Sequence, residues 1–451
     1  MARSEITTRD WLLLVMVALT VGLIALNETA IGLALPAMRQ DLAMSAPQSH
    51  WAVNAYLLVF AACIAGAGKL GDVVGLKPLY LMGVVVFALG SAACGWAASA
   101  DYIIAARAIQ GLGAAAIYPA ALAISSLIFP PEREGHALGI FSVIGAAFLV
   151  LGPLAGGLLT QGLSWRWIFW INLPAAAIAI PVVLLCHFAE ARKDAKPRFD
   201  FAGLVLLIVG LGALVIGTMQ GSDWGWSSAG TVFSLAIGVI ALAMFAVVEL
   251  RMTQPLIRVA LFAGGAFAFA NAAVYLGMFQ RMVVAVFGAL FLQDVLGYDP
   301  IDAGLALLPA MIPVALLATY GGRLSDRLDP VAITRAGMAA TGLCLAWVAL
   351  AVALRNYLVM LPALVLWGAV MTLIMAPPRR IIMAIAGRDQ RGEASGISLA
   401  TQLLGATTGV AVASALLNAT STYWIIFAVT AALTLVVSAL GLMVRGAGQT
   451  K

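Results

Sequence analysis

The sequence predicts an all-α membrane protein with fourteen transmembrane helices, arranged as two six-helix bundles with two further helices inserted between them. Of its 451 residues, 63% are hydrophobic and only 10% are charged, whereas soluble domains carry about 25% charged residues. The chain holds fourteen apolar segments of roughly 20 residues, the length that a bilayer requires. Two similar turns, each after the second helix of a six-helix block, indicate a duplicated bundle.

Charges and Gly/Pro-rich turns separate the fourteen segments. Their expected limits are 11–35, 51–70, 79–98, 102–127, 137–159, 166–188, 201–220, 229–248, 266–292, 303–322, 331–353, 357–377, 396–418 and 422–443. With these limits, 20 of the 25 Lys and Arg residues fall in alternate loops. The positive-inside rule therefore predicts a multi-pass protein with both termini in the cytoplasm, and the composition indirectly indicates the bacterial inner membrane.

The composition also argues against several classes of protein. The net charge of +5 is explained by the topology signals, so no nucleic-acid partner is expected. The four cysteines lie in apolar runs without pair spacing and the three histidines are dispersed, so we expect no disulfide, metal site or cofactor. No cluster of nucleophile, base and metal ligands indicates an enzyme, and no extramembrane stretch is long enough for a sensor domain or an ATPase.

The two similar turns define the expected domains. "GKLGDVVGLKP" begins at Gly68, and "GGRLSDRLDP" contains Asp326 and Arg327. Each turn places an aspartate four residues after a glycine and then a basic residue, a pattern suited to a tight cytoplasmic turn. We expect an N-terminal bundle over 1–188, linkers and two inserted helices over 189–264, and a C-terminal bundle over 265–451.

Several motifs resemble those of the major facilitator superfamily and, within it, the 14-span drug:proton antiporter family. The matching residues are Gly68, Asp72, Gly75 and Lys77 in the first turn, Arg107, Gln110, Gly111 and Gly113 in "RAIQGLGAA", and Gly145, Gly152, Pro153, Gly156 and Gly157 in "GAAFLVLGPLAGG". "WRWIFWINLP" (165–174) and "FLQDVLGYDPIDAGLALLP" (291–309) extend the resemblance over nearly the whole chain. The resemblance implies a major facilitator fold without cofactors, and proton-coupled export of hydrophobic or amphipathic small molecules by a monomer in the bilayer.

One motif departs from the family pattern. The first span of the family usually reads Leu-Asp-x-Thr, and the aspartate is implicated in proton handling. Here Asn27 stands at the aspartate position and the acid is Glu28, one residue later. One residue turns a helical side chain by about 100°, so Glu28 takes over the proton site from a different face, or the coupling differs.

Glu28 and Arg107 form the candidate proton-coupling pair. The predicted spans place both charges at similar depth, roughly 10 Å and 8 Å below the external face. Intramembrane ionisable residues are functional by default, so we expect the two to communicate directly or through water. A static ion pair that only fixes helix packing is the alternative.

The substrate cavity is expected to include Asn27, Gln110, Gln280 and Arg281. Arg281 lies near the middle of the ninth span, the first helix of the second bundle, and a guanidinium there needs an anion, a carbonyl or water. A structural arginine bonded to carbonyls of a broken helix is the alternative. Two buried arginines against one buried acid also favour, as a second hypothesis, export of a lipid-like, anionic or zwitterionic metabolite.

The string "GPLAGG" is the candidate gate. Gly152 and Gly156 allow close packing of helices in lipid and Pro153 bends the helix, which predicts a seam between the halves that seals one face. Gly405 and Gly409 are its counterpart in the second half. The antiporter motif argues against the remaining alternative, uptake by symport.

Overall fold

The structure is a computed structural model that describes residues 6–129, 133–186, 200–252, 255–317, 320–321, 324, 327–386 and 391–444. Within these residues every regular element is a helix. Among the described residues, thirteen helical segments are long and apolar enough to cross a membrane, and Pro300–Leu316 is a shorter apolar helix. This agrees with the predicted all-α membrane fold.

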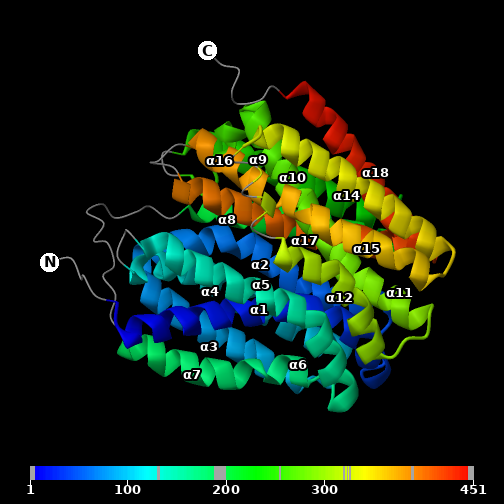
Figure 1. Cartoon of the computed structure of the whole chain (residues 1–451), viewed down its shortest axis with the longest axis horizontal. Helices are drawn as coiled ribbons and strands as arrows, with labels where there is room; N and C mark the ends of the chain where they lie inside the picture. Colours follow the sequence, from blue (N-terminus) through cyan, green and yellow to red (C-terminus); the bar gives the residue numbers. More distant parts are fainter. Residues whose placement is uncertain are drawn as a thin grey trace. The chain divides into compact units, whose positions relative to one another are not determined.

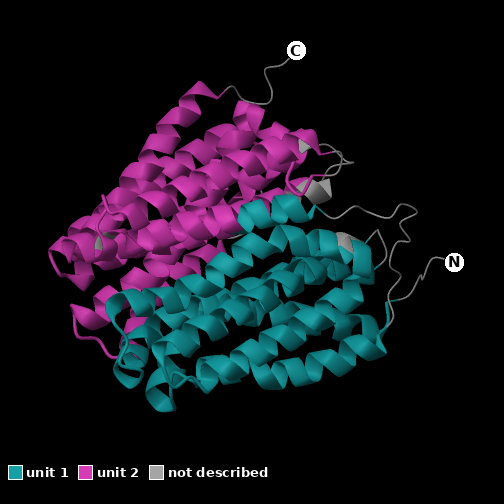
Figure 2. Ribbon diagram, turned by 180° about the vertical axis from the view of Figure 1, so that it is seen from behind, with its two compact units in different colours: residues 1–208 teal, residues 209–451 magenta. Residues whose placement is uncertain are grey.

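The chain divides into two compact units, Met1–Ile208 and Val209–Lys451, with the division inside helix α8 (Figure 2). The helices of unit 1 are α1 (Thr8–Asp41), α2 (Ala46–Val74), α3 (Leu76–Gly95), α4 (Ala100–Ile128), α5 (Glu134–Gly162), α6 (Trp167–Trp170), α7 (Asn172–Leu185) and the first part of α8 (Phe201–Trp224). The three expected domains, with boundaries at 188 and 264, stay a prediction.

Unit 2 contains the rest of α8 and the helices that follow it in the sequence, whose α-helices are labelled in Figure 1. They are α9 (Ala229–Arg251), η2 (Val259–Ala263), α10 (Gly265–Met282), the π-helical turn η3 (Val283–Phe287), α11 (Gly288–Asp294), α12 (Pro300–Leu316), α14 (Pro330–Ala353), α15 (Tyr357–Met371), η4 (Thr372–Ile374), α16 (Ala376–Ala386), α17 (Arg391–Thr420), α18 (Tyr423–Leu440) and η5 (Gly441–Met443).

Local sequence sets the helix starts. Thr7 and Asp10 form a reciprocal capping box before α1, and Ser45 and Gln48 form another before α2. In such a box two of the backbone N–H groups that a helix start leaves without partners are satisfied by side chains. Short polar residues placed between apolar runs therefore determine where these spans begin.

Several predicted spans differ from the structure at an end or by a break, and proline explains two of the differences. The segment 166–188 is broken into α6 and α7, because Pro174 has no N–H for the carbonyl four residues earlier. The segment 357–377 is broken at η4 and then continues as α16 to Ala386, with Pro377 and Pro378 at the break. The limit at 377 was therefore wrong, and Arg379 and Arg380 lie on a helix instead of in a loop.

A third difference concerns the segment 303–322. Helix α12 starts earlier, at Pro300, because the Asp299 side chain accepts the Asp302 backbone N–H and a proline suits the first helical turn. It ends at Leu316, and part of the remaining predicted segment lies outside the described residues.

The helix pairs inside each unit follow the same plan. In unit 1 the strongest pairs are α3 with α4, α1 with α5 and α2 with α4. In unit 2, α14 packs on α15, α10 on α17, and α12 on α15. If α10, α12, α14, α15 and α17 correspond in order to α1, α2, α3, α4 and α5, these are the same three pairs. This agreement supports the duplication expected from the two turns.

Candidate functional site

Glu28 lies in the middle of α1 and is 6% exposed. Its carboxylate interacts electrostatically with two groups of unit 1, the Arg107 guanidinium on α4 and the Tyr56 phenol on α2. The Tyr56 hydroxyl is itself fully buried and has no hydrogen-bond partner among the described residues. Three helices thus place an acid, a cation and a phenol in one buried cluster, which we call the Glu28 cluster.

Backbone and ring contacts hold Arg107 within this cluster. Its Nε donates to the Ala52 carbonyl at 2.9 Å and its Nη1 donates to Gln110 Oε1 at 2.6 Å. The guanidinium carbon lies 4.1 Å from the centroid of the Tyr56 ring, within the range of a cation–π contact. The second terminal nitrogen, Nη2, has no partner among the described side chains and backbone. Arg107 therefore keeps its Nη2 group available while the bonds from Nε and Nη1 fix its position.

A chain of hydrogen bonds leads from Arg107 back to α1. Gln110 Nε2 donates to Ser91 Oγ at 2.8 Å. Asn172 Nδ2 donates to the same hydroxyl at 3.1 Å, and Asn27 Nδ2 donates to Asn172 Oδ1 at 3.1 Å. The network joins α1, α3, α4 and α7, and its end at Asn27 is the residue next to Glu28.

This network of hydrogen bonds fixes the positions of the Asn27 and Gln110 side chains. Both side chains are 0% exposed, and their expected role as cavity residues stays a prediction. Tyr56, Ser91 and Asn172 were missed by the sequence analysis. Asn172 lies within the quoted stretch "WRWIFWINLP", so an amide inside an apolar segment was a usable signal there. No comparable sequence signal singles out Ser91 or Tyr56.

The "GPLAGG" glycines bring α5 close to α1. A Cβ on Gly156 would lie 2.6 Å from the Ala30 carbonyl oxygen, and one on Gly152 would collide with the Thr29 side chain. Small residues permit such close approach in membrane helices. Both contacts are with α1, one and two residues from Glu28, so Gly152 and Gly156 pack inside unit 1 and not at the seam between the halves that was expected. A role in gating for Gly145, Gly152, Pro153, Gly156 and Gly157 stays a prediction.

The turn after α2 shows what two of its motif residues do. Gly75 has φ of +96°, a conformation that side chains disfavour, and it ends α2 directly before α3. Lys77 Nζ donates to the carbonyls of Leu184 and Cys186 at 2.8 and 2.9 Å. A cation at a helix C-terminus satisfies its last carbonyls, so Lys77 fixes the end of α7.

The remaining turn residues are placed less completely. Gly68 lies in the last part of α2, as does the backbone of Asp72, whose side chain is not among those described. In the second turn Arg327 is exposed, and Asp326 lies outside the described residues.

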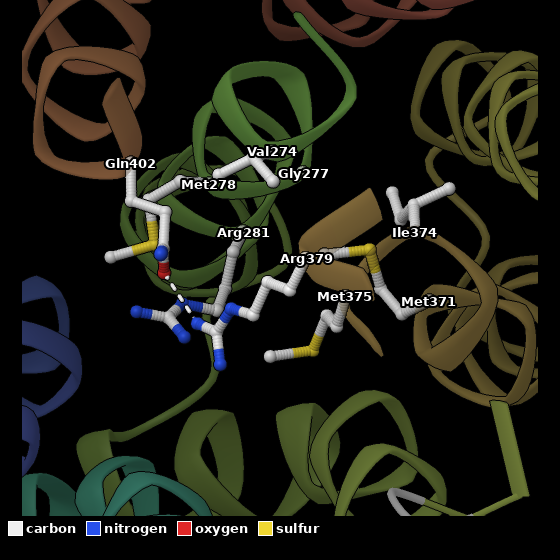
Figure 3. A pocket seen from close by; sticks show the side chains of 9 residues that line it. All are labelled: Val274, Gly277, Met278, Arg281, Met371, Ile374, Met375, Arg379 and Gln402. Atoms are coloured by element: carbon white, nitrogen blue, oxygen red, sulfur yellow. Dashed lines mark hydrogen bonds between the residues drawn. The ribbon is translucent and has the colours of Figure 1, made fainter. Parts of the chain in front are cut away.

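Arg281 lines a pocket that lies wholly within unit 2 (Figure 3). The pocket and its mouth have an empty volume of about 320 Å³. Its lining is Val274, Gly277, Met278, Arg281, Met371, Ile374, Met375, Arg379 and Gln402. Arg379 donates to Gln402 Oε1 at 2.9 Å. Arg379 was assigned to a loop by the sequence analysis and Gln402 was missed; the proline break before α16 brings Arg379 to the pocket.

Gln280, next to Arg281, points to other partners. Its Nε2 donates to Thr434 Oγ1 at 2.9 Å, and its Oε1 accepts from Trp367 Nε1 at 3.1 Å. Gln280 is 0% exposed and ties α10 to α15 and α18. Its expected cavity role stays a prediction. Among the described residues, no group of three or more His, Cys, Asp and Glu side chains could hold a metal ion.

The sequence matches a known protein family and known proteins. The family model described as Major Facilitator Superfamily matches residues 17–291 and 269–450. The chain is 34% identical over 402 residues to Multidrug resistance protein Stp of Mycobacterium tuberculosis, covering 88% of this chain and 74% of that protein.

Two Streptomyces proteins are similar to the same extent. A tetracenomycin C resistance and export protein of Streptomyces glaucescens is 33% identical over 405 residues, covering 90% of this chain and 75% of the relative. A puromycin resistance protein of Streptomyces alboniger is 32% identical over 408 residues, covering 88% and 80%. With the duplicated helical units described above, these matches show that the chain belongs to the Major Facilitator Superfamily and is a multi-pass membrane transporter of its drug-efflux type, not an enzyme.

Proposed function

We propose that the protein exports hydrophobic or amphipathic small molecules in exchange for protons, and that Glu28 carries the proton. The observation that carries this proposal is the Glu28 cluster, in which a buried acid on α1 lies within electrostatic range of Arg107, whose guanidinium is held by the Ala52 carbonyl, Gln110 and the Tyr56 ring. A buried ionisable group inside a membrane span is costly, and such groups mark proton and substrate pathways.

Protonation of Glu28 changes the forces on Arg107. When the carboxylate is charged it attracts the guanidinium, and when it takes a proton that attraction is lost. Arg107 is bonded to the α2 backbone at Ala52 and through Gln110 to α3. The charge state of Glu28 therefore acts on the contacts among α1, α2, α3 and α4, which is the kind of local change that biases a two-state transporter.

The energetics suit an exporter. Moving one charge across a membrane potential supplies about 2.3 kcal/mol per 100 mV, which supports a gradient of roughly fifty-fold per proton. Coupling requires that the substrate interact differently with the protonated and deprotonated forms. On this proposal the protein works as a monomer in the bacterial inner membrane, with both termini in the cytoplasm, as the distribution of Lys and Arg predicts.

The test is ethidium transport by the full-length protein in proteoliposomes under an imposed pH gradient, comparing the wild type with Glu28→Gln. The glutamine keeps the size of the side chain and one acceptor oxygen but cannot take up the proton. We expect gradient-driven transport to fall at least tenfold while ethidium binding is retained.

Glu249→Gln is the matched control. Glu249 is also a buried glutamate, 3% exposed, near the end of α9, where its Oε2 accepts the Ile257 backbone N–H at 3.0 Å. A glutamine can accept the same bond, so transport should be unchanged. Equal gradient-driven transport by Glu28→Gln and the wild type would remove Glu28 as the proton carrier.

A further inference from the structure

The unit 2 pocket combines two cationic side chains with a flexible apolar wall. In the view of Figure 3 the Arg281 and Arg379 side chains extend in the same direction, toward Gln402, whose Oε1 accepts a hydrogen bond from Arg379. None of the nine lining residues is acidic. Guanidinium groups bind carboxylate and other oxyanions through paired, charge-assisted hydrogen bonds, so these two arginines are suited to an anionic group.

The rest of the lining suits an apolar body. Val274 and Ile374 supply aliphatic surface, and Met278, Met371 and Met375 supply thioether side chains. Methionine side chains are unbranched and polarizable, so they adapt to ligands of different shape. The lining therefore suits a small molecule with one charged end.

Two irregular helices build this pocket. Arg281 stands two residues before the π-helical turn η3, and Met371, Ile374 and Met375 lie at or beside the 3₁₀ turn η4. Single π-helical turns inside α-helices occur frequently at functional sites. Val274, Gly277, Met278 and Arg281 share one face of α10, since they lie three, four and seven residues apart.

We infer that this pocket binds small amphipathic organic anions, with Arg281 and Arg379 holding the anionic group and the methionines holding the apolar body. The assignment rests on the proposed export function, because it names a class of substrate that this function carries. On the predicted orientation Arg379 lies toward the cytoplasmic end of the span Tyr357–Ile385, the side from which an exporter takes up its substrate.

The test is equilibrium binding of radiolabelled naphthalene-2-carboxylate to the purified full-length protein in detergent, with naphthalene-2-methylammonium as the cationic competitor. We expect the carboxylate to bind and the ammonium to compete at least tenfold more weakly. Arg281→Gln should weaken carboxylate binding roughly tenfold, and Arg379→Gln roughly fivefold, because Arg379 is exposed and its charge is screened by solvent.

Arg380→Gln is the matched control. It removes the same charge from the next position of α16, but Arg380 does not line the pocket. Carboxylate affinity should stay within twofold of the wild type. Arg379→Lys keeps the charge without the planar fork of donors. Its carboxylate affinity should lie between those of the wild type and Arg379→Gln. Unfolding temperatures equal to that of the wild type show that all four variants are folded.

The outcomes separate this inference from the proposed function. Carboxylate binding that depends on Arg281 and Arg379 supports the inference even if Glu28→Gln still transports ethidium. Equal binding of the carboxylate and the ammonium, or equal weakening by Arg380→Gln and Arg379→Gln, overturns it while leaving proton-coupled export intact. Complete displacement of the carboxylate by phosphatidylglycerol at lipid-like concentrations also overturns it, because the pocket would then belong to a lipid head group.

Discussion

Two helix pairs, α1 with α5 in unit 1 and α10 with α17 in unit 2, share a backbone arrangement but carry different charges. A Cβ on Gly156 would lie 2.6 Å from the Ala30 carbonyl oxygen, and one on Gly409 would lie 3.0 Å from that of Phe279. Four residues earlier on each helix, Gly152 approaches the turn at Leu26 and Gly405 approaches the carbonyl of Tyr275. Ala30 therefore corresponds to Phe279.

This correspondence shows where the charges differ. Counting along the helices, Glu28 corresponds to Gly277, and Arg281 corresponds to Gly32. Gly277 and Arg281 both line the unit 2 pocket. The position of the acid on α1 thus corresponds to Gly277 on α10, and the cation Arg281 lies one helical turn further along α10.

A second pair of helices agrees with the first. A Cβ on Gly111 of α4 would lie 2.5 Å from the Tyr56 carbonyl oxygen, and one on Gly368 of α15 would collide with that of Ala310. Tyr56 precedes the turn glycine Gly68 by twelve residues, and Ala310 precedes Gly322 by the same number.

Arg107 lies four residues before Gly111, and Leu364 lies four residues before Gly368, so these two residues correspond to each other. In unit 2, Leu364 and Ala310 therefore occupy the positions of Arg107 and Tyr56, whose side chains are in cation–π contact in unit 1. The comparison teaches that duplication preserved the points where backbones touch, because any side chain there would clash. The charged side chains between those points were free to diverge into an acid cluster and an arginine pocket.

The largest expected effect is at the shared glycines. Gly405→Ala should destabilise the protein by about 3 kcal/mol, because the new methyl group meets the backbone carbonyl of Tyr275, which cannot rotate away. Thermal unfolding in detergent, followed with a thiol-reactive dye, measures this, since Cys94, Cys186 and Cys344 are buried.

Gly152→Ala tests the corresponding contact in unit 1. Here the methyl group meets the Thr29 side chain, so Thr29→Ala should relieve part of the loss. Gly145→Ala is the control, because nothing lies within 4 Å of its Cβ position, and alanine should stabilise that helix by up to about 1 kcal/mol. Equal losses of stability in Gly405→Ala, Gly152→Ala and Gly145→Ala would contradict the close packing shared by the two units.

The next effect concerns the charge that unit 2 lacks. Arg107→Leu gives unit 1 the residue found at the corresponding position, Leu364. The change leaves Gln110 Oε1 without the Arg107 donor and removes the additional bond to the Ala52 carbonyl, which should cost about 2–3 kcal/mol. In proteoliposomes, ethidium transport should also lose its response to the pH gradient. Full coupling in this variant would show that Arg107 serves packing alone.

Buried amides give a third, smaller effect. Gln280→Ala removes two hydrogen bonds, to Thr434 and Trp367, and Gln110→Ala removes two, to Arg107 and Ser91. Both variants should lose about 1–2 kcal/mol of unfolding free energy. Only Gln110→Ala should change the pH dependence of transport, because its amide positions Arg107. A changed pH dependence in Gln280→Ala would weaken the distinction between the two units.

The smallest effect is expected at the turns. Lys77→Met removes the two bonds to the end of α7 and should cost about 0.5–1 kcal/mol, since this lysine is partly exposed. Arg327→Met, at the exposed basic residue of the second turn, should leave the unfolding temperature unchanged within about 1 °C. Unfolding curves of the two variants side by side give the answer, and a larger loss in Arg327→Met would contradict it.

The sequence was informative where a physical constraint acts along the chain. Apolar length predicted the spans, because backbone groups in lipid must bond within a helix. The glycine pairs at Gly152 and Gly405 were visible as a spacing, since only small residues allow close approach. Proline breaks were harder to place: Pro377 and Pro378 marked the end of a predicted span, whereas the helix resumes and carries Arg379 into the pocket.

Taken by itself, the sequence determined the membrane class, the duplication and the identity of Glu28, Arg107 and Arg281 as charges inside spans. Only the tertiary structure decided their partners. Tyr56 and Asn172 are distant from Arg107 in sequence but join its cluster or its hydrogen-bond network, and Gln402 reaches Arg379 from another helix. The reason is physical: a helix fixes neighbours three and four residues away, while contacts between helices depend on packing that no local pattern encodes.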